Sequence, residues 1–182
     1  MKILMIARIR FDNTQEKAIA SKLLSQQKAF EKLGNSTDLV HLNESGIYIN
    51  QTLIKRASLK NSIATKLYFF KKLFTDILKL IDISQYDLLY IRYPMSTYDF
   101  LRFLGKIKVK NSNIKIVLEM PTFPYHKEKR GFFGKLISFI DKDKRTQLNK
   151  NVDYITHFGT EKKIFNIPII NIQNGANPDE YQ

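Results

Sequence analysis

The chain contains no cysteine. Without thiols it has no disulfide framework, no thiolate metal site and no cysteine nucleophile. No glycine occurs between Ala7 and Gly34, and this absence excludes the glycine-rich dinucleotide fingerprint and the phosphate-binding P-loop after the first apolar segment. The three histidines, His41, His126 and His157, lie far apart and have no ligand spacing, so we expect no metal site.

Long apolar runs are also missing, and none approaches the roughly 20 residues that span a bilayer. The opening run Ile3–Ala7 is ended by Arg8, which favours a buried first strand over a signal peptide. A length of 182 residues with 43% hydrophobic residues fits one globular domain. We therefore expect a cytoplasmic protein.

Acidic residues are few, with 17 Asp and Glu against 30 Lys and Arg, and the net charge is +13. Such a charge favours an anionic partner, which is a nucleic acid, an anionic lipid or a phosphorylated substrate. A general lysine bias of the source proteome explains the same charge. Because the lysines are scattered and no nucleic-acid-binding motif is present, we expect no nucleic-acid partner.

Strand and helix signals alternate along the chain. Apolar runs predict strands at Ile3–Ile9, Thr37–Leu42, Asp87–Tyr93, Ile114–Met120, Val152–Phe158 and Pro168–Ile172. Helical periodicity predicts helices over 15–34, 58–81, 97–108 and 131–150, with Gly34 as a C-terminal cap and Ser96 as an N-cap. Residues 43–57 give no prediction. This order predicts an α/β fold with a mostly parallel, doubly wound sheet flanked by helices, and places the chemistry at the carboxyl ends of the strands.

Two charged residues lie at the ends of two predicted strands. Glu119 ends an apolar strand, where a carboxylate is costly to bury unless it is paired, and Arg92 at the same end of another strand is the expected partner. Arg10 follows the first predicted strand and is a candidate contact for a charged or hydroxylated acceptor, although a solvated arginine explains it equally. The Glu119–Arg92 pair is compatible with a purely structural role.

The segment after Glu119 is aromatic, bears hydroxyl groups and is stiffened by two prolines. Thr122, Tyr125 and His126 lie in it, and such a segment suits sugar binding because ring faces pack on C–H surfaces and hydroxyls find partners. The alternative is a structural loop held by proline.

Residues 55–81 hold seven lysines and arginines against one acid, Asp76. A basic helix with extra aromatic residues can lie on an anionic membrane surface, with Lys66, Lys72 and Lys79 facing the lipid. The alternative is an ordinary packed helix with a basic solvent face.

Four segments in this order resemble the N-terminal domain of bacterial two-domain (GT-B) glycosyltransferases of family 4, of the type that builds capsular or other surface polysaccharide. They are MKILMIA leading to a helix that ends in KAFEKLG, then YDLLYIRYP, KIVLEMPTFPYHKE and PIINIQNGANPDEY. In that family a strand followed by Asn-Gly marks the passage from the first domain to the second. The resemblance implies a Rossmann-like acceptor-binding domain over 1–173 and the start of an inter-domain linker over 174–182, with Asn174 and Gly175 at the hinge and the donor-binding domain absent.

The resemblance also implies an activity. The family transfers a sugar, with retention of configuration, from a nucleotide-sugar to a glycan or polyprenyl-diphosphate-linked acceptor at the inner membrane face, and needs no tightly bound metal. We thus expect no cofactor in this domain, a nucleotide-sugar donor for the full-length enzyme, and no activity of the isolated chain. Its catalytic residues stay unassigned, and the expected acceptor-binding residues are Arg10, Arg92, Glu119, Thr122, Tyr125 and His126.

The sequence departs from the family at two places. The first loop lacks the glycines of many members, and Glu119 stands where many members have a histidine. Two alternatives therefore stay open. One is a basic α/β module that binds nucleic acid or an anionic membrane surface without catalysis, and the other is a complete small enzyme of another Rossmann-like family.

Overall fold

The computed structural model describes residues 1–59, 68, 72–121, 123, 141–142 and 144–172. Within these residues one sheet is formed by β1 (Lys2–Arg10), β2 (Ser36–Asn43), β3 (Gly46–Ile49), β4 (Thr52–Arg56), β5 (Leu88–Arg92), β6 (Lys115–Glu119), β7 (Tyr154–His157), β8 (Lys163–Ile164) and β9 (Ile167–Asn171). The helices are α1 (Lys17–Lys32), α3 (Leu73–Leu80) and α4 (Tyr98–Lys110), with short 3-10 turns η1 (Thr14–Glu16), η2 (Ile83–Gln85) and η4 (Arg145–Lys150).

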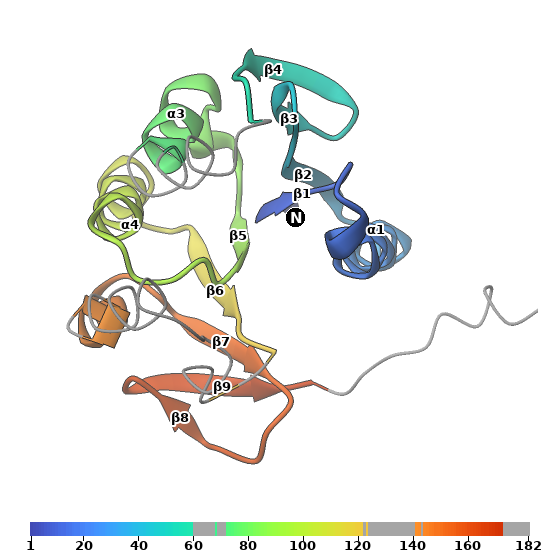
Figure 1. The fold of residues 1–182 in the computed structure, drawn as a ribbon. Coiled ribbons are helices and arrows are strands. Elements are labelled where there is room, and N and C mark those ends of the chain that lie inside the picture. Colours follow the sequence, from blue (N-terminus) through green and yellow to red (C-terminus); the bar gives the residue numbers. More distant parts are fainter. Residues whose placement is uncertain (60–67, 69–71, 122, 124–140, 143, 173–182) are drawn as a thin grey trace, which may run out of the picture.

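The strand order is β4-β3-β2-β1-β5-β6-β7-β9-β8 (Figure 1). The central strands β2, β1, β5, β6, β7 and β9 are parallel, and β3, β4 and β8 add to the two edges in antiparallel pairs. The chain moves outward from β1 to β2 and then returns to β5 on the other side of β1. The topological switch point therefore lies between β1 and β5, where doubly wound folds place their ligands.

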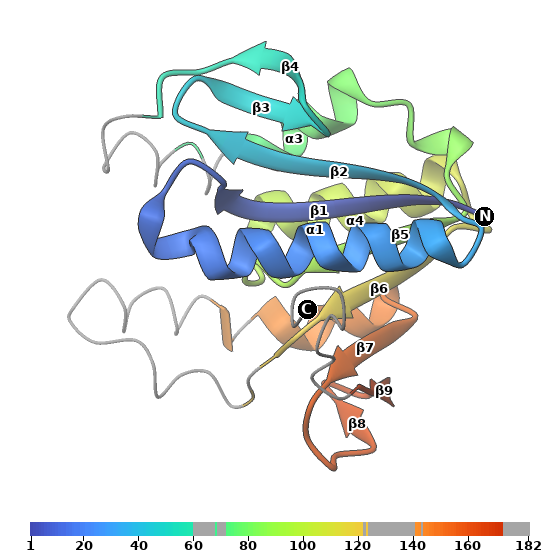
Figure 2. The same ribbon diagram turned by 90° about the vertical axis from the view of Figure 1, so that its right-hand side faces the viewer.

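Helices cover both faces of the sheet. Helix α1 lies along β1 on one face, and α3 and α4 lie on the opposite face (Figures 1 and 2). Strand β1 serves both layers, since Ile3 and Met5 pack with Leu23 of α1 while Leu4 and Ile6 join the larger core under α3 and α4. This two-sided burial explains the continuous apolar run at the start of the sequence.

The predicted α/β fold with a mostly parallel, doubly wound sheet is confirmed. All six predicted strands are present, with ends within two residues of the expected ones. The edge strands β3, β4 and β8 were not predicted. Strands β3 and β8 are only four and two residues long, and polar residues flank the apolar pair of β4.

Two helix boundaries differ from the sequence-based expectation. The predicted start at residue 58 is wrong, because the amides of Ala57 and Leu59 bond to the carbonyls of Ser45 and Glu44, each at 2.9 Å, and continue the extended chain. Residues 60–67 and 69–71 lie outside the described part of the chain. The C-terminal part of the predicted helix is present as α3. Likewise, residues 131–140 and 143 of the predicted helix over 131–150 are outside the described part.

The N-cap of α4 is Thr97 rather than Ser96. The Thr97 hydroxyl accepts the amide of Phe100 at 3.2 Å, which satisfies one of the open donors of the first turn. Ser96 is fully buried one position earlier, and its hydroxyl meets that of Tyr93 at 2.6 Å. Among the described helices, none combines the length and the hydropathy that crossing a membrane requires.

Candidate functional site

A buried carboxylate with several donors lies at the carboxyl ends of β5 and β6. Glu119 Oε1 accepts Lys22 Nζ at 2.8 Å and Gln26 Nε2 at 3.4 Å, and Oε2 accepts Arg92 Nη1 at 3.3 Å. We call these four residues, Lys22, Gln26, Arg92 and Glu119, the Glu119 cluster. The Arg92–Glu119 pair expected from the sequence is present, while its role towards an acceptor stays a prediction.

Local structure explains why these side chains meet. Arg92 and Glu119 are register partners on the adjacent parallel strands β5 and β6, so their side chains leave the same face of the sheet. Lys22 and Gln26 are four residues apart on α1, which puts them on one flank of the helix above that face. The cluster therefore ties α1 to the carboxyl edge of the sheet.

The cluster carries an excess positive charge. Lys22 and Arg92 together bring two positive charges against one carboxylate, which leaves +1. The Glu119 side chain is 0% exposed, whereas those of Lys22 and Arg92 are 35% and 21% exposed. Glu119 thus orients two cations that reach solvent, and a guanidinium beside an ammonium suits a phosphate or diphosphate group.

The wall of the cluster is hydroxyl-bearing and aromatic. The Tyr90 hydroxyl lies 3.2 Å from Thr156 Oγ1, and Lys22 Nζ sits 4.8 Å from the centre of the Phe158 ring. Burial, together with the nearby Glu119 charge, raises the pKa of Tyr90 to about 12. Tyr90 is therefore a neutral hydroxyl at physiological pH and can serve as a hydrogen-bond donor.

Two arginines of β1 lie at the same edge of the sheet but face the α3/α4 side. Arg10 binds Asp12 through Nε and Nη2, each at 3.0 Å, and donates Nη1 to the carbonyl of Leu59 at 3.0 Å. Hydrogen bonding to Asp12 raises the pKa of Arg10. Arg8 is half-buried beside the switch point, where burial lowers its pKa to about 10 against the opposing charge of Glu16, so it remains protonated at neutral pH.

The structure thus brings Arg92 and Glu119 together and places Arg10 on the opposite face. Lys72 and Lys79 are exposed, just before α3 and in its last turn. The other predicted functional residues lie outside the described part of the chain, and they are Lys66, Thr122, Tyr125, His126, Asn174 and Gly175. Sequence analysis missed Lys22 and Gln26, which belong to no motif and reach the site only through the docking of α1.

His157 ends β7 close to this edge. Its Nδ1 is 2.7 Å from the carbonyl oxygen of Met120, and its Nε2 is 3.2 Å from Glu161 Oε2. The ring is 3% exposed and meets the edge of Phe123, with ring centres 6.4 Å apart. Within the described residues, no three histidine, aspartate or glutamate side chains come together as a metal site.

Comparisons with known proteins address the fold. No family model matches the chain, and no curated protein matches it. An alpha-glucosyltransferase in complex with UDP and a 13-mer DNA containing a central A:G mismatch aligns with 95% of this chain and 40% of its own, at 17% identity and a TM-score of 0.52. A second alpha-glucosyltransferase structure, with UDP and a 13-mer DNA containing a HMU base, aligns with 95% of this chain and 42% of its own, at 16% identity and a TM-score of 0.51.

The chain therefore has the Rossmann-like α/β fold found in part of a glycosyltransferase. It spans about two fifths of the length of these structures, 40% and 42%. At this level of identity the likeness concerns the fold alone.

Proposed function

We propose that the chain is the acceptor-side half of a nucleotide-sugar-dependent glycosyltransferase. The observation that carries this proposal is the alignment of 95% of the chain with only 40% of an alpha-glucosyltransferase solved with UDP. The proposal assigns the nucleotide-sugar to a second domain of the full-length protein. In this proposal a hexosyl group passes with retention of configuration to a glycan or polyprenyl-diphosphate-linked acceptor, in the synthesis of a surface polysaccharide.

The Glu119 cluster supports an anionic acceptor. It presents the partly exposed Lys22 and Arg92 at the carboxyl edge of the sheet, with a net charge of +1. A diphosphate accepts hydrogen bonds from both cations, and charge-assisted bonds of this kind are roughly twice as strong as neutral ones. Glu119 is a positioning residue in this scheme, since it is fully buried and already accepts three donors.

A second candidate function involves nucleic acid. The net charge is +13, and the two aligned alpha-glucosyltransferases were solved with DNA. This pair of observations supports a nucleic-acid acceptor in place of a lipid-linked one, or binding of nucleic acid without catalysis. Binding to DNA that falls steeply with salt favours this candidate.

Sugar transfer by the full-length protein tests the proposal. The protein is incubated with a panel of radiolabelled nucleotide-sugars and either membrane lipids or DNA as acceptors. We expect transfer to the lipid fraction, reduced at least about tenfold by Lys22→Met and Arg92→Met, since each removes a charged hydrogen bond. The matched control is Arg102→Met, an exposed arginine of α4. Transfer to no acceptor from any nucleotide-sugar contradicts the proposal, and transfer to DNA alone selects the second candidate.

We further propose that the exposed lysines at the two ends of α3 attach the protein to the inner membrane face. Lys72 precedes the helix and Lys79 lies in its last turn, and each lysine near an anionic surface contributes about 1 kcal/mol. The double variant Lys72→Glu/Lys79→Glu should bind anionic vesicles at least about tenfold more weakly. Lys28→Glu, on the other face of the sheet, is the control. Equal binding of the double variant and the native protein removes this part of the proposal.

A further inference from the structure

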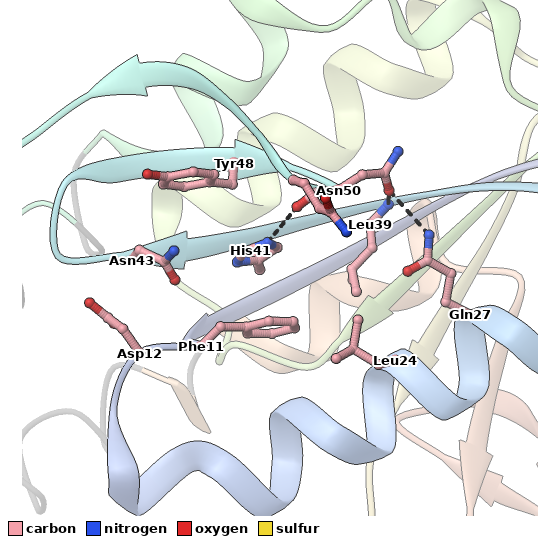
Figure 3. A pocket seen from close by; sticks show the side chains of 10 residues that line it. Phe11, Asp12, Leu24, Gln27, Leu39, His41, Asn43, Tyr48 and Asn50 are labelled. Carbon is pink, nitrogen blue, oxygen red and sulfur yellow. Dashed lines mark hydrogen bonds between the residues drawn. The ribbon is translucent and has the colours of Figure 1, made fainter.

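A hollow of about 540 Å³ lies on the other flank of α1, between this helix and the β2–β3 hairpin (Figure 3). Leu24 and Gln27 of α1 face the hollow, whereas Lys22 and Gln26 of the same helix face the Glu119 cluster. The two sites are therefore separated by α1, whose diameter with side chains is about 10–12 Å. Arg10, Arg92 and Glu119, the expected acceptor-binding residues that the structure describes, do not line this hollow.

One wall is a fixed stack of aromatic rings. Phe11 stacks on His41 with ring centres 3.9 Å apart and planes 16° apart, and His41 stacks on Tyr48 at 5.6 Å and 16°. The middle ring is held in place because His41 Nε2 lies 2.8 Å from the carbonyl oxygen of Asn50. A ring stack positioned in this way offers apolar surface without ordering side chains when a ligand binds.

The polar side of the hollow is fixed as well. Asn50 Oδ1 accepts the amide of Leu39 at 2.9 Å and Gln27 Nε2 at 3.1 Å, and Asn50 Nδ2 donates to Asp38 at 2.8 Å. Asn50 adopts a left-handed backbone conformation, with φ of 52°, that asparagine tolerates better than most residues. These contacts orient the Asn50 and Gln27 amide groups before a ligand arrives.

One buried polar atom at the hollow lacks a hydrogen-bond partner among the described residues. This atom is Asn43 Oδ1. Buried acceptors without a partner are uncommon in folded proteins. A ligand hydroxyl satisfies this atom once the Asn43 side chain turns it towards the hollow. Asn43 follows the stacked ring of His41 on the same face of β2.

The charge of the lining restricts the ligand. Among the described residues, no lysine or arginine lines the hollow, although the chain carries a net charge of +13. The one acid among the described lining residues, Asp12, is already engaged by Arg10 and by the amide of Glu44 at 2.8 Å. A phosphorylated or otherwise anionic ligand finds no cation here. Amide groups, a tyrosine hydroxyl and apolar ring surface together match an uncharged ring that bears hydroxyl groups.

We propose that this hollow binds a neutral sugar ring. The inference rests on the proposed function, because it assigns a neutral sugar unit of the acceptor to the hollow and leaves the anionic part for the Glu119 cluster. We expect a dissociation constant of about 1 mM for a single sugar ring, because an open site with few polar contacts binds weakly.

The test is a protein-observed NMR titration of the ¹⁵N-labelled chain with glucose, galactose and N-acetylglucosamine. We expect shifts of the Leu24, Tyr48 and Gln51 amides, unchanged between low and high salt because no ion pair is involved. Asn43→Leu should weaken binding about tenfold by removing the acceptor. It should not lower the thermal midpoint, because the native Oδ1 atom has no partner to lose. Leu24→Glu, at an exposed position, is the second variant, and Lys28→Ala is the control.

Sugars that leave the amide signals of the hollow unshifted overturn the inference, as does a nucleoside that shifts them at lower concentration than any sugar. Affinities of Asn43→Leu and Leu24→Glu for the sugars that equal that of the native protein also overturn it. Sugar transfer that persists while the hollow binds no sugar removes this inference alone. Sugar binding in the hollow without any transferase activity of the full-length protein removes the proposed function and leaves the site.

Discussion

Replacement of Glu119 by glutamine separates the two functions of the buried carboxylate, which are to hold α1 on the sheet and to orient two cations. Glutamine keeps the shape of the side chain but removes its charge. It also turns an amide group with two N–H donors towards Lys22 or Arg92, which have no acceptor to offer. The change therefore leaves two positive charges facing each other next to a side chain that is 0% exposed in the native protein.

The magnitude follows from the burial of the partners. Removing one member of a fully buried ion pair costs about 3–5 kcal/mol, whereas exposed pairs contribute about 0–1 kcal/mol. Lys22 and Arg92 are 35% and 21% exposed, so both regain part of their hydration when the carboxylate is lost. We expect Glu119→Gln to lower the free energy of unfolding by about 2–3 kcal/mol, which corresponds to about 4–12 °C in Tm for a chain of this size.

Urea denaturation followed by circular dichroism measures this loss. Glu31→Gln is the control for the change of glutamate to glutamine, since Glu31 is an exposed glutamate of α1. A double-mutant cycle with Lys22→Met should give a coupling of about 1 kcal/mol or more, because the two side chains meet at 2.8 Å. A stability of Glu119→Gln equal to that of the control, or strict additivity with Lys22→Met, refutes this account of the cluster.

Three further stability predictions follow from single positions, each measured by urea unfolding. Gly46→Ala should cost about 2 kcal/mol or more, because φ is 146° and the new Cβ overlaps the backbone carbonyl of Lys55. Gly105→Ala, inside α4 with nothing within 4 Å of the new Cβ, should instead stabilise by about 0.5–1 kcal/mol. Asp153→Asn should cost about 1–2 kcal/mol at neutral pH. Burial opposes ionisation of Asp153, but bonds from Lys108 and a backbone amide outweigh it and lower its pKa below the ordinary 3.8. The stabilisation is therefore present above that value and disappears as the pH falls through the folded-state pKa, and an equal deficit of Asp153→Asn at all pH values contradicts it.

The central strands could be predicted because the sheet buries them on both faces. Parallel strands covered by helices produce continuous apolar runs, such as Ile3–Ile9, that one sequence reveals. The edge strands lack this signal. Strand β4 combines Leu53 and Ile54 with flanking polar residues, and β8 is two residues long, Lys163–Ile164. Their pairing depends on neighbours distant in sequence and not on their own pattern.

Only part of the candidate site could be predicted from the sequence. The Arg92–Glu119 pair was predicted because both residues end apolar strands at the same edge of the expected sheet, and the structure shows that these strands are adjacent. The contribution of Lys22 does not, because periodicity gives the apolar side of α1 but not its position along the sheet. The aromatic stack also escaped prediction, since Tyr48 reaches His41 only through the β2–β3 hairpin, in a segment that gave no secondary-structure signal.

Steady-state kinetics of the full-length protein test the central claim most directly, with the Michaelis constants for acceptor and donor measured separately for native protein, Arg92→Met and the control Arg102→Met. The account predicts that Arg92→Met raises KM for the acceptor about tenfold and leaves KM for the nucleotide-sugar unchanged, because the proposal assigns Arg92 to the acceptor and not to the donor. A rise in the donor KM with an unchanged acceptor KM contradicts the assignment of this chain to the acceptor side.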